Sequence, residues 1–204
     1  MSHSMGSFEA NGVAIQTAQP SLASSLLRNG SIVLAGSAFI AICAHLSIPL
    51  FFTPVPVTLQ PFAVVLLGML LSPRLAFGAA VAYLVEGTSG LPVFTPSGPG
   101  GMLQLLGPTG GYLFSYSIVA PLVATLWRRS SRSFSRGLIV ASIGSLVILT
   151  LGALWLGIEL HRAPLTVAEA AILPFLPGDV LKVVLAAAIA STWARFRRTS
   201  SAQN

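Results

Sequence analysis

Six apolar segments, joined by short connections, constrain the fold more than any other feature of this 204-residue chain. The segments cover about residues 31–50, 57–72, 75–90, 110–127, 137–158 and 169–194. Each is close to the roughly 20 residues that a helix needs to cross a bilayer, provided that some helices tilt or are short. Only 8% of the residues are charged, against about 25% in soluble domains. The pattern predicts an all-α membrane protein with six transmembrane helices.

Six spans of this length use most of the chain and leave only short loops. We therefore expect one six-helix membrane domain over residues 28–198, preceded by a polar cytoplasmic segment at residues 1–27 and followed by a cytoplasmic tail at residues 199–204. The opening residues lack the basic start and apolar core of a signal peptide, and residues 1–7 are set aside as a candidate artificial extension.

The basic residues predict how the helices are oriented. An even number of spans places both termini on one side, together with Arg28, Arg74, the connection at residues 128–136 and the tail at residues 195–198. The opposite connections carry only Arg162. Because basic residues are retained in the cytoplasm, we expect a multi-pass protein of the cell membrane with both termini inside. The chain has a net charge of +6. Its basic residues lie beside apolar runs and not on a polar face, which argues against nucleic-acid binding.

The long connection at residues 87–111 is crowded with Gly and Pro and contains the apolar sequence GLPVF. This composition does not suit a continuous helix and is too apolar for a freely solvated loop. Non-helical backbone near a membrane must be buried in protein or face water. The sequence therefore predicts outward-facing loops that fold into a cap over a ligand pocket. The last helix is expected to begin at Pro177, where the missing N–H of proline is tolerated.

Asp179 and Lys182 are the most informative ionisable residues, because a charge that faces lipid is costly. Their spacing of three places both on one face near the start of the last helix. One interpretation is a mutual ion pair that only neutralises both charges. The other is a pocket in which Lys182 binds an anionic group and Asp179 accepts hydrogen bonds from donors of the same ligand.

Four further residues are candidates for the pocket, each with an alternative. Glu86 ends the third span, where it either contacts a ligand or reaches water at the interface. Gln60 either hydrogen-bonds a ligand or pairs with a neighbouring helix. Tyr83 and Tyr112 flank the Gly-rich connection and either form aromatic walls or anchor the interface.

The sequence offers little for catalysis. It contains no G-x-S-x-G or H-E-x-x-H motif and no second aspartate that would form a dyad with Asp179. The lone Cys43 lies in an apolar run and has no partner for an intramolecular disulfide. We expect no enzymatic activity, no catalytic residues, no cofactor and no metal.

Four stretches occur together in an order typical of one known family. They are FTPVPVTLQPF at residues 52–62, YLVEGTSGLPVF at 83–94, GPTGGYL at 107–113 and PFLPGDVLK at 174–182. Through them the chain resembles the BioY family, the biotin-specific substrate-binding (S) components of energy-coupling factor (ECF) transporters. With the intervening spans, the resemblance covers about residues 30–195.

The resemblance implies uptake of biotin, captured with high affinity at the outer side of the membrane. It implies that Asp179 and Lys182 contact biotin, with Glu86, Gln60, Tyr83 and Tyr112 as further contacts. It also implies a membrane coupling (T) subunit and two cytoplasmic ATPases as partners, and the chain itself has no P-loop. An S component for another vitamin and an intramembrane enzyme are the alternatives. The sequence does not indicate an oligomeric state.

Overall fold

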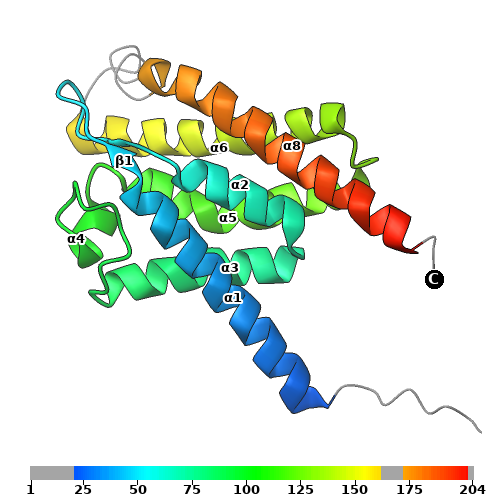
Figure 1. The fold of residues 1–204 in the computed structure, drawn as a ribbon. Helices are drawn as coiled ribbons and strands as arrows, with labels where there is room; N and C mark the ends of the chain where they lie inside the picture. Colours follow the sequence, from blue (N-terminus) through cyan, green and yellow to red (C-terminus); the bar gives the residue numbers. More distant parts are fainter. Residues whose placement is uncertain (1–20, 162–171, 202–204) are drawn as a thin grey trace, which may run out of the picture.

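The computed structural model describes residues 21–161 and 172–201, and these residues form a bundle that is almost entirely helical (Figure 1). The predictions for residues 1–20, 162–171 and 202–204, including the one for Arg162, lie outside the described residues. The helices are α1 (Leu22–His45), α2 (Gln60–Leu70), α3 (Pro73–Thr88), α4 (Gly101–Leu106), α5 (Gly110–Arg129), α6 (Phe134–Leu160), the 3-10 helix η1 (Leu173–Phe175) and α8 (Leu176–Ser201).

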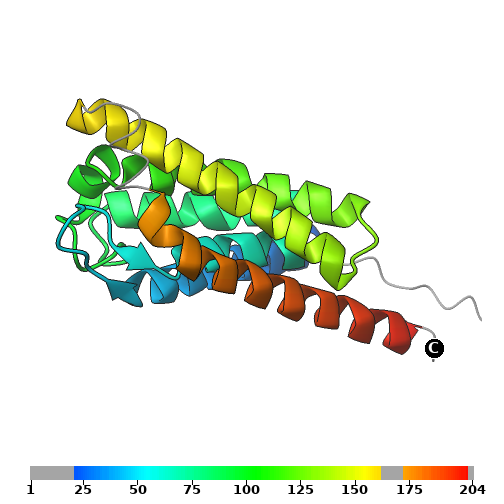
Figure 2. The same ribbon diagram turned by 90° about the horizontal axis from the view of Figure 1, so that it is seen from above.

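Helix α5 occupies the centre of the bundle. It contacts α2, α3 and α6, while α1 packs on α3 and α8 packs on α6 and α2. Both views of the ribbon show the long helices running along the bundle, with α4 at one end and the C-terminus at the other (Figures 1 and 2). The interior contains small residues where helices approach closely, such as Gly36 of α1 against Ala79 of α3.

Four helices of the described chain are long and apolar enough to cross a membrane: α1, α5, α6 and the stretch Leu173–Ser200. The other two predicted spans are shorter helices. α2 has 11 residues and α3 has 16, which correspond to roughly 16 and 24 Å at ~1.5 Å per residue. Proline explains the end of α2, because Pro73 disfavours helical backbone at Ser72, and Leu71 and Ser72 are extended.

The helix boundaries depart from the apolar segments at several points. α1 begins at Leu22, where the Ser21 side chain caps it, and it ends at His45 rather than near residue 50. The last helix begins at Leu176, one residue before the predicted Pro177. Residues 46–59 were predicted to contain the end of one span and the start of the next. They form instead a small antiparallel hairpin of β1 (Ser47–Ile48) and β2 (Val57–Thr58), in which Ser47 pairs with Thr58.

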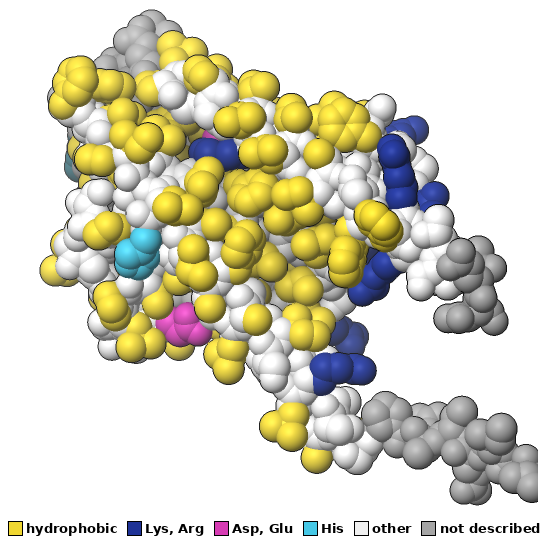
Figure 3. Space-filling view, viewed as in Figure 1, with side chains coloured by type: hydrophobic (Ala, Val, Ile, Leu, Met, Phe, Trp, Pro, Cys, Tyr) yellow, Lys and Arg dark blue, Asp and Glu magenta, His cyan; other side chains and the backbone are white. Residues whose placement is uncertain are grey.

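Apolar side chains cover much of the outer surface of the helices, among them Leu146, Ile158 and Leu181, each more than half exposed. Figure 3 shows this apolar surface on one face, with most visible Lys and Arg side chains gathered at the end where α8 terminates. A soluble protein rarely exposes so large an apolar patch. Together with the four apolar spans, the surface identifies a multi-pass membrane protein.

Two connections fold together at the end of the bundle opposite the C-terminus, and we call residues 46–59 and 89–109 the cap. The cap is attached to the helices by specific contacts. Trp155 of α6 donates a hydrogen bond from Nε1 to the carbonyl of Gly107 at 2.9 Å. Phe94 is buried and packs edge-on against Tyr83 of α3, with 5.3 Å between the ring centroids. The expected folded connection is therefore confirmed at residues 89–109, where α4 lies.

Candidate ligand-binding site

A narrow cavity lies beneath the cap, between α2, α5, α6 and α8. The empty space in and around it is about 490 Å³, which includes solvent at its open mouth. Its walls are mainly apolar and aromatic, with polar side chains at a few points. The polar residues that line it are Thr58, Gln60, Thr95, Gln104, Thr109, Asp179 and Lys182.

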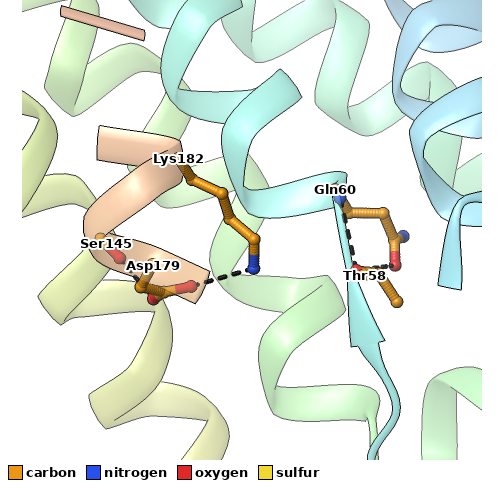
Figure 4. A network of polar contacts seen from close by, with 5 residues as sticks. All are labelled: Thr58, Gln60, Ser145, Asp179 and Lys182. Atoms are coloured by element: carbon orange, nitrogen blue, oxygen red, sulfur yellow. Dashed lines mark hydrogen bonds and ion pairs between the residues drawn. The ribbon is translucent and has the colours of Figure 1, made fainter. Parts of the chain in front are cut away.

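Asp179 and Lys182 lie together in this cavity, as their spacing predicted. Lys182 Nζ is 3.0 Å from Asp179 Oδ1, and each side chain is only 8% exposed. The second carboxylate oxygen, Oδ2, accepts a hydrogen bond of 2.6 Å from the Ser145 hydroxyl of α6. Both carboxylate oxygens therefore have a hydrogen-bond partner, which offsets the cost of burying the group. Figure 4 shows Lys182 extending from α8 into the interior.

Gln60, at the first position of α2, forms a second polar group on the opposite wall (Figure 4). Its Nε2 donates to the Tyr83 hydroxyl of α3 at 2.6 Å, and its Oε1 accepts from the Thr58 hydroxyl at 3.1 Å. Gln60 thus lines the cavity and also pairs with a neighbouring helix. Tyr83 is fully buried and is not among the lining residues, so its hydroxyl holds Gln60 in place from behind.

Aromatic rings from two helices form one side of the cavity. Tyr112 and Tyr116 come from α5, and Phe175 comes from η1. The Tyr112 and Phe175 rings lie 6.3 Å apart and tilted by 41°. Gly152 of α6 allows this arrangement, because a Cβ atom there would overlap the Tyr112 ring. Tyr112 is buried inside the protein, so it is a wall of the cavity rather than an interfacial anchor.

Glu86 does not lie at this cavity. Its Oε1 accepts a hydrogen bond of 2.8 Å from the Ser37 hydroxyl of α1, and Glu86 is absent from the lining residues. Tyr83, three residues earlier on α3, instead reaches Gln60 of α2 with its hydroxyl. In the structure Glu86 joins α3 to α1, and its contact with a ligand stays a prediction.

The cluster of Ser145, Asp179 and Lys182 presents a hydrogen-bond acceptor directly beside a donor. The two charged atoms are only 3.0 Å apart, and both residues line the same cavity. The expectation that Lys182 binds an anionic group and Asp179 binds donors of the same ligand stays a prediction. Within the described residues, no three His, Cys, Asp or Glu side chains are grouped to hold a metal ion.

Three lining or supporting residues were not foreseen from the sequence: Ser145, Thr95 and Gln104. Ser145 precedes Asp179 by 34 positions, and one serine in an apolar helix carries no signal of its own. Thr95 and Gln104 lie inside the Gly- and Pro-rich connection, where a polar side chain is unremarkable. Thr and Gln side chains are mostly exposed in proteins, and Thr95 and Gln104 stand out only because the structure buries them.

Comparison with known proteins agrees with the described architecture. The family model described as "BioY family" matches residues 16–199. The biotin transporter BioY of Thermotoga maritima is 37% identical over 154 residues, which span 76% of this chain and 88% of that protein. The biotin transporter BioY of Rhodobacter capsulatus is 36% identical over 165 residues, spanning 74% of this chain and 84% of that protein.

A solved structure shows the same fold. The crystal structure of the S-component for biotin from an ECF-type ABC transporter superposes with a TM-score of 0.76 at 28% sequence identity. The superposition covers 87% of this chain and 95% of that one. The family match extends over nearly all of the described helices, including every residue of the cavity. The chain belongs to the BioY family.

Proposed function

We propose that this chain binds biotin with high affinity and mediates its uptake, as the S component of an ECF-type transporter. The observation that carries the proposal is the cavity itself, in which a buried Ser145–Asp179–Lys182 cluster faces an apolar and aromatic interior beneath a cap. Relatives named biotin transporters match about three quarters of this chain, and the crystal structure of an S-component for biotin shares its fold. A transport role requires no catalytic step, which agrees with the absence of catalytic motifs from the sequence.

The ureido group of biotin is complementary to the charged cluster. A ureido group places an N–H donor next to a C=O acceptor, and Asp179 and Lys182 place an acceptor next to a donor at 3.0 Å. Asp179 accepts from the ureido N–H and Lys182 donates to its carbonyl, both as charge-assisted bonds. The fused rings lie against Tyr112 and Phe175, and Gln60 supplies a further polar contact from the opposite wall.

We also infer that six helices cross the membrane, with α2 and α3 as short spans and the cap on the outer side. The distribution of charge supports this orientation. Arg128, Arg129, Arg132 and Arg136 lie at the end of the bundle opposite the cap, as do the basic residues that end α8. Basic residues of this kind mark the cytoplasmic side. Both termini are then cytoplasmic, and biotin reaches the cavity from outside the cell.

Energy for release into the cytoplasm comes, in this proposal, from a membrane coupling subunit and two cytoplasmic ATPases. The chain has no P-loop of its own. Helix α1 offers a surface for the coupling subunit, because Ser31, Ala35 and Ala38 are exposed on it, while Gly36 and Ser37 are buried toward the bundle. Small exposed residues allow another helix to approach closely in the membrane.

Titration of the detergent-solubilised chain with biotin tests the binding proposal. A saturable 1:1 complex is expected, and desthiobiotin, which keeps the ureido group and the carboxylate, should compete with biotin. Thiamine and riboflavin, which lack a cyclic urea joined to an aliphatic carboxylate, should not. Competition by either of these vitamins in place of biotin would identify an S component for another vitamin.

A further inference from the structure

Two buried polar atoms of the cap have no hydrogen-bond partner among the described residues: Thr95 Oγ1 and Gln104 Nε2. Thr95 is 5% exposed and Gln104 is 2% exposed, and both residues line the cavity that contains Asp179 and Lys182. A buried polar group that has no hydrogen-bond partner destabilises the folded chain. Two such groups line the same cavity, and no contact within the described residues explains why these polar atoms are buried there.

The amide of Gln104 is held in a defined orientation. Its Oε1 accepts a hydrogen bond of 3.1 Å from the backbone N–H of Gly100, so Nε2 is left as the donor. Gly100 adopts a φ of +73°, which favours glycine, and Gly98 packs so closely that a Cβ atom there would lie 2.6 Å from Gln104 Cδ. The local backbone thus fixes an amide donor in the cavity wall.

We infer that Gln104 and Thr95 bind the carboxylate of biotin, an inference that rests on the proposed function. A carboxylate only accepts hydrogen bonds, and Gln104 Nε2 and the Thr95 hydroxyl are both available as donors. The alternative position beside Lys182 would place the carboxylate next to the negative charge of Asp179, which lies 3.0 Å from the ammonium. Like charges at that range repel each other strongly in a buried site.

The geometry of the ligand agrees with two separate polar sites. Biotin carries its ureido group and its carboxylate at opposite ends, separated by the fused rings and a chain of four methylene groups. In the protein, α4 and the start of α8 lie apart at the same end of the bundle (Figure 1), and both contribute to one cavity. The charged cluster binds one end of the ligand, and the cap binds the other while it covers the site.

Two substitutions remove the donors with little change of shape: Gln104→Met and Thr95→Val. Each variant is titrated with biotin and with an analogue in which a methyl group replaces the carboxylate. We expect each substitution to weaken biotin binding by about 10- to 100-fold, as for loss of a hydrogen bond to a charged group, and to change the affinity for the analogue by less than about twofold. Leu103→Ala, at a neighbouring cap residue that is 71% exposed, is the matched control and should bind both ligands like the unmodified chain.

The melting temperature of the ligand-free protein separates a binding role from a structural one. Removal of an unsatisfied buried hydroxyl should leave Thr95→Val at least as stable as the unmodified chain. Equal losses for biotin and for the analogue, or no loss for biotin in either variant, would overturn the inference while leaving biotin binding intact. If Gln104→Met does not fold, the result for Thr95→Val decides. If the folded unmodified chain binds neither ligand, the proposed function fails and this inference fails with it.

Discussion

Lys182 Nζ lies 3.0 Å from Asp179 Oδ1 inside a membrane protein, and both side chains are 92% shielded from solvent. A buried pair of this kind is weak support for stability in itself, because removing two charges from water costs about as much as their attraction returns. What the pair provides is a hydrogen-bond acceptor and a hydrogen-bond donor side by side in the wall of a cavity.

Removing one charge of the pair should harm stability and binding together, whereas removing both should harm binding alone. Asp179→Asn leaves the Lys182 ammonium uncompensated, which we expect to cost about 3–5 kcal/mol. The double substitution Asp179→Asn with Lys182→Met should recover most of the melting temperature. It should still bind biotin at least ~100-fold more weakly than the unmodified chain. Thermal unfolding in detergent and a biotin titration measure both effects, and a double variant that binds normally would refute the role of the pair.

Ser145→Ala tests the residue that holds the Asp179 carboxylate in place. The hydroxyl donates to Asp179 Oδ2 at 2.6 Å, and loss of a hydrogen bond to a charged group costs roughly 1.5–3 kcal/mol. We expect biotin affinity to fall by about 10-fold or more. Ser117→Ala is the matched control, because the Ser117 hydroxyl bonds to the Phe114 carbonyl of its own helix, away from the cavity. Equal affinities of the two variants would show that Ser145 does not position Asp179.

Gly152→Ala tests the aromatic wall. A Cβ atom at this position would overlap the Tyr112 ring, so the ring must move toward the cavity or the helices must separate. Overpacking of this kind costs about 1–3 kcal/mol, and we expect weaker biotin binding and a lower melting temperature. Gly30→Ala is the control on α1, where no atom lies within 4 Å of the added Cβ. If Gly152→Ala is as neutral as Gly30→Ala, Tyr112 is not confined as described.

Glu86→Gln tests whether the Glu86 side chain of α3 contacts α1 or the bound ligand. Glu86 accepts a hydrogen bond from Ser37 of α1, and an amide oxygen accepts the same bond. We expect biotin affinity to stay within about threefold of the unmodified chain, with at most a small loss of stability of ~1 kcal/mol. An affinity that falls by a factor of ten or more in a folded Glu86→Gln protein would place Glu86 in the binding site.

Local patterns explain what the sequence predicted well. Asp179 and Lys182 were identified because a spacing of three places residues on one helical face, and their contact follows from that geometry. The long apolar helices were also predictable from the sequence, because an apolar segment of about 20 residues is long enough to cross a membrane as a helix. The start of the last helix was placed within one residue, because proline and glycine mark helix boundaries.

Contacts between residues that are far apart in the sequence could not be predicted in this way. The pairing of Gln60 with Tyr83 and of Ser145 with Asp179 depends on how α2, α3, α6 and α8 pack. The hairpin of β1 and β2 was missed because strands of two residues have no periodic pattern. The hydrogen bond between Ser37 and Glu86 was not predicted either, because it depends on which helix packs beside α3.

The affinity of the purified, detergent-solubilised chain for biotin, measured beside Asp179→Asn, tests the central claim most directly. We expect saturable 1:1 binding by the unmodified chain and at least a ~100-fold loss in the variant, equivalent to about 2.7 kcal/mol. Absence of biotin binding by a chain shown to be folded, or unchanged binding by Asp179→Asn, would contradict it.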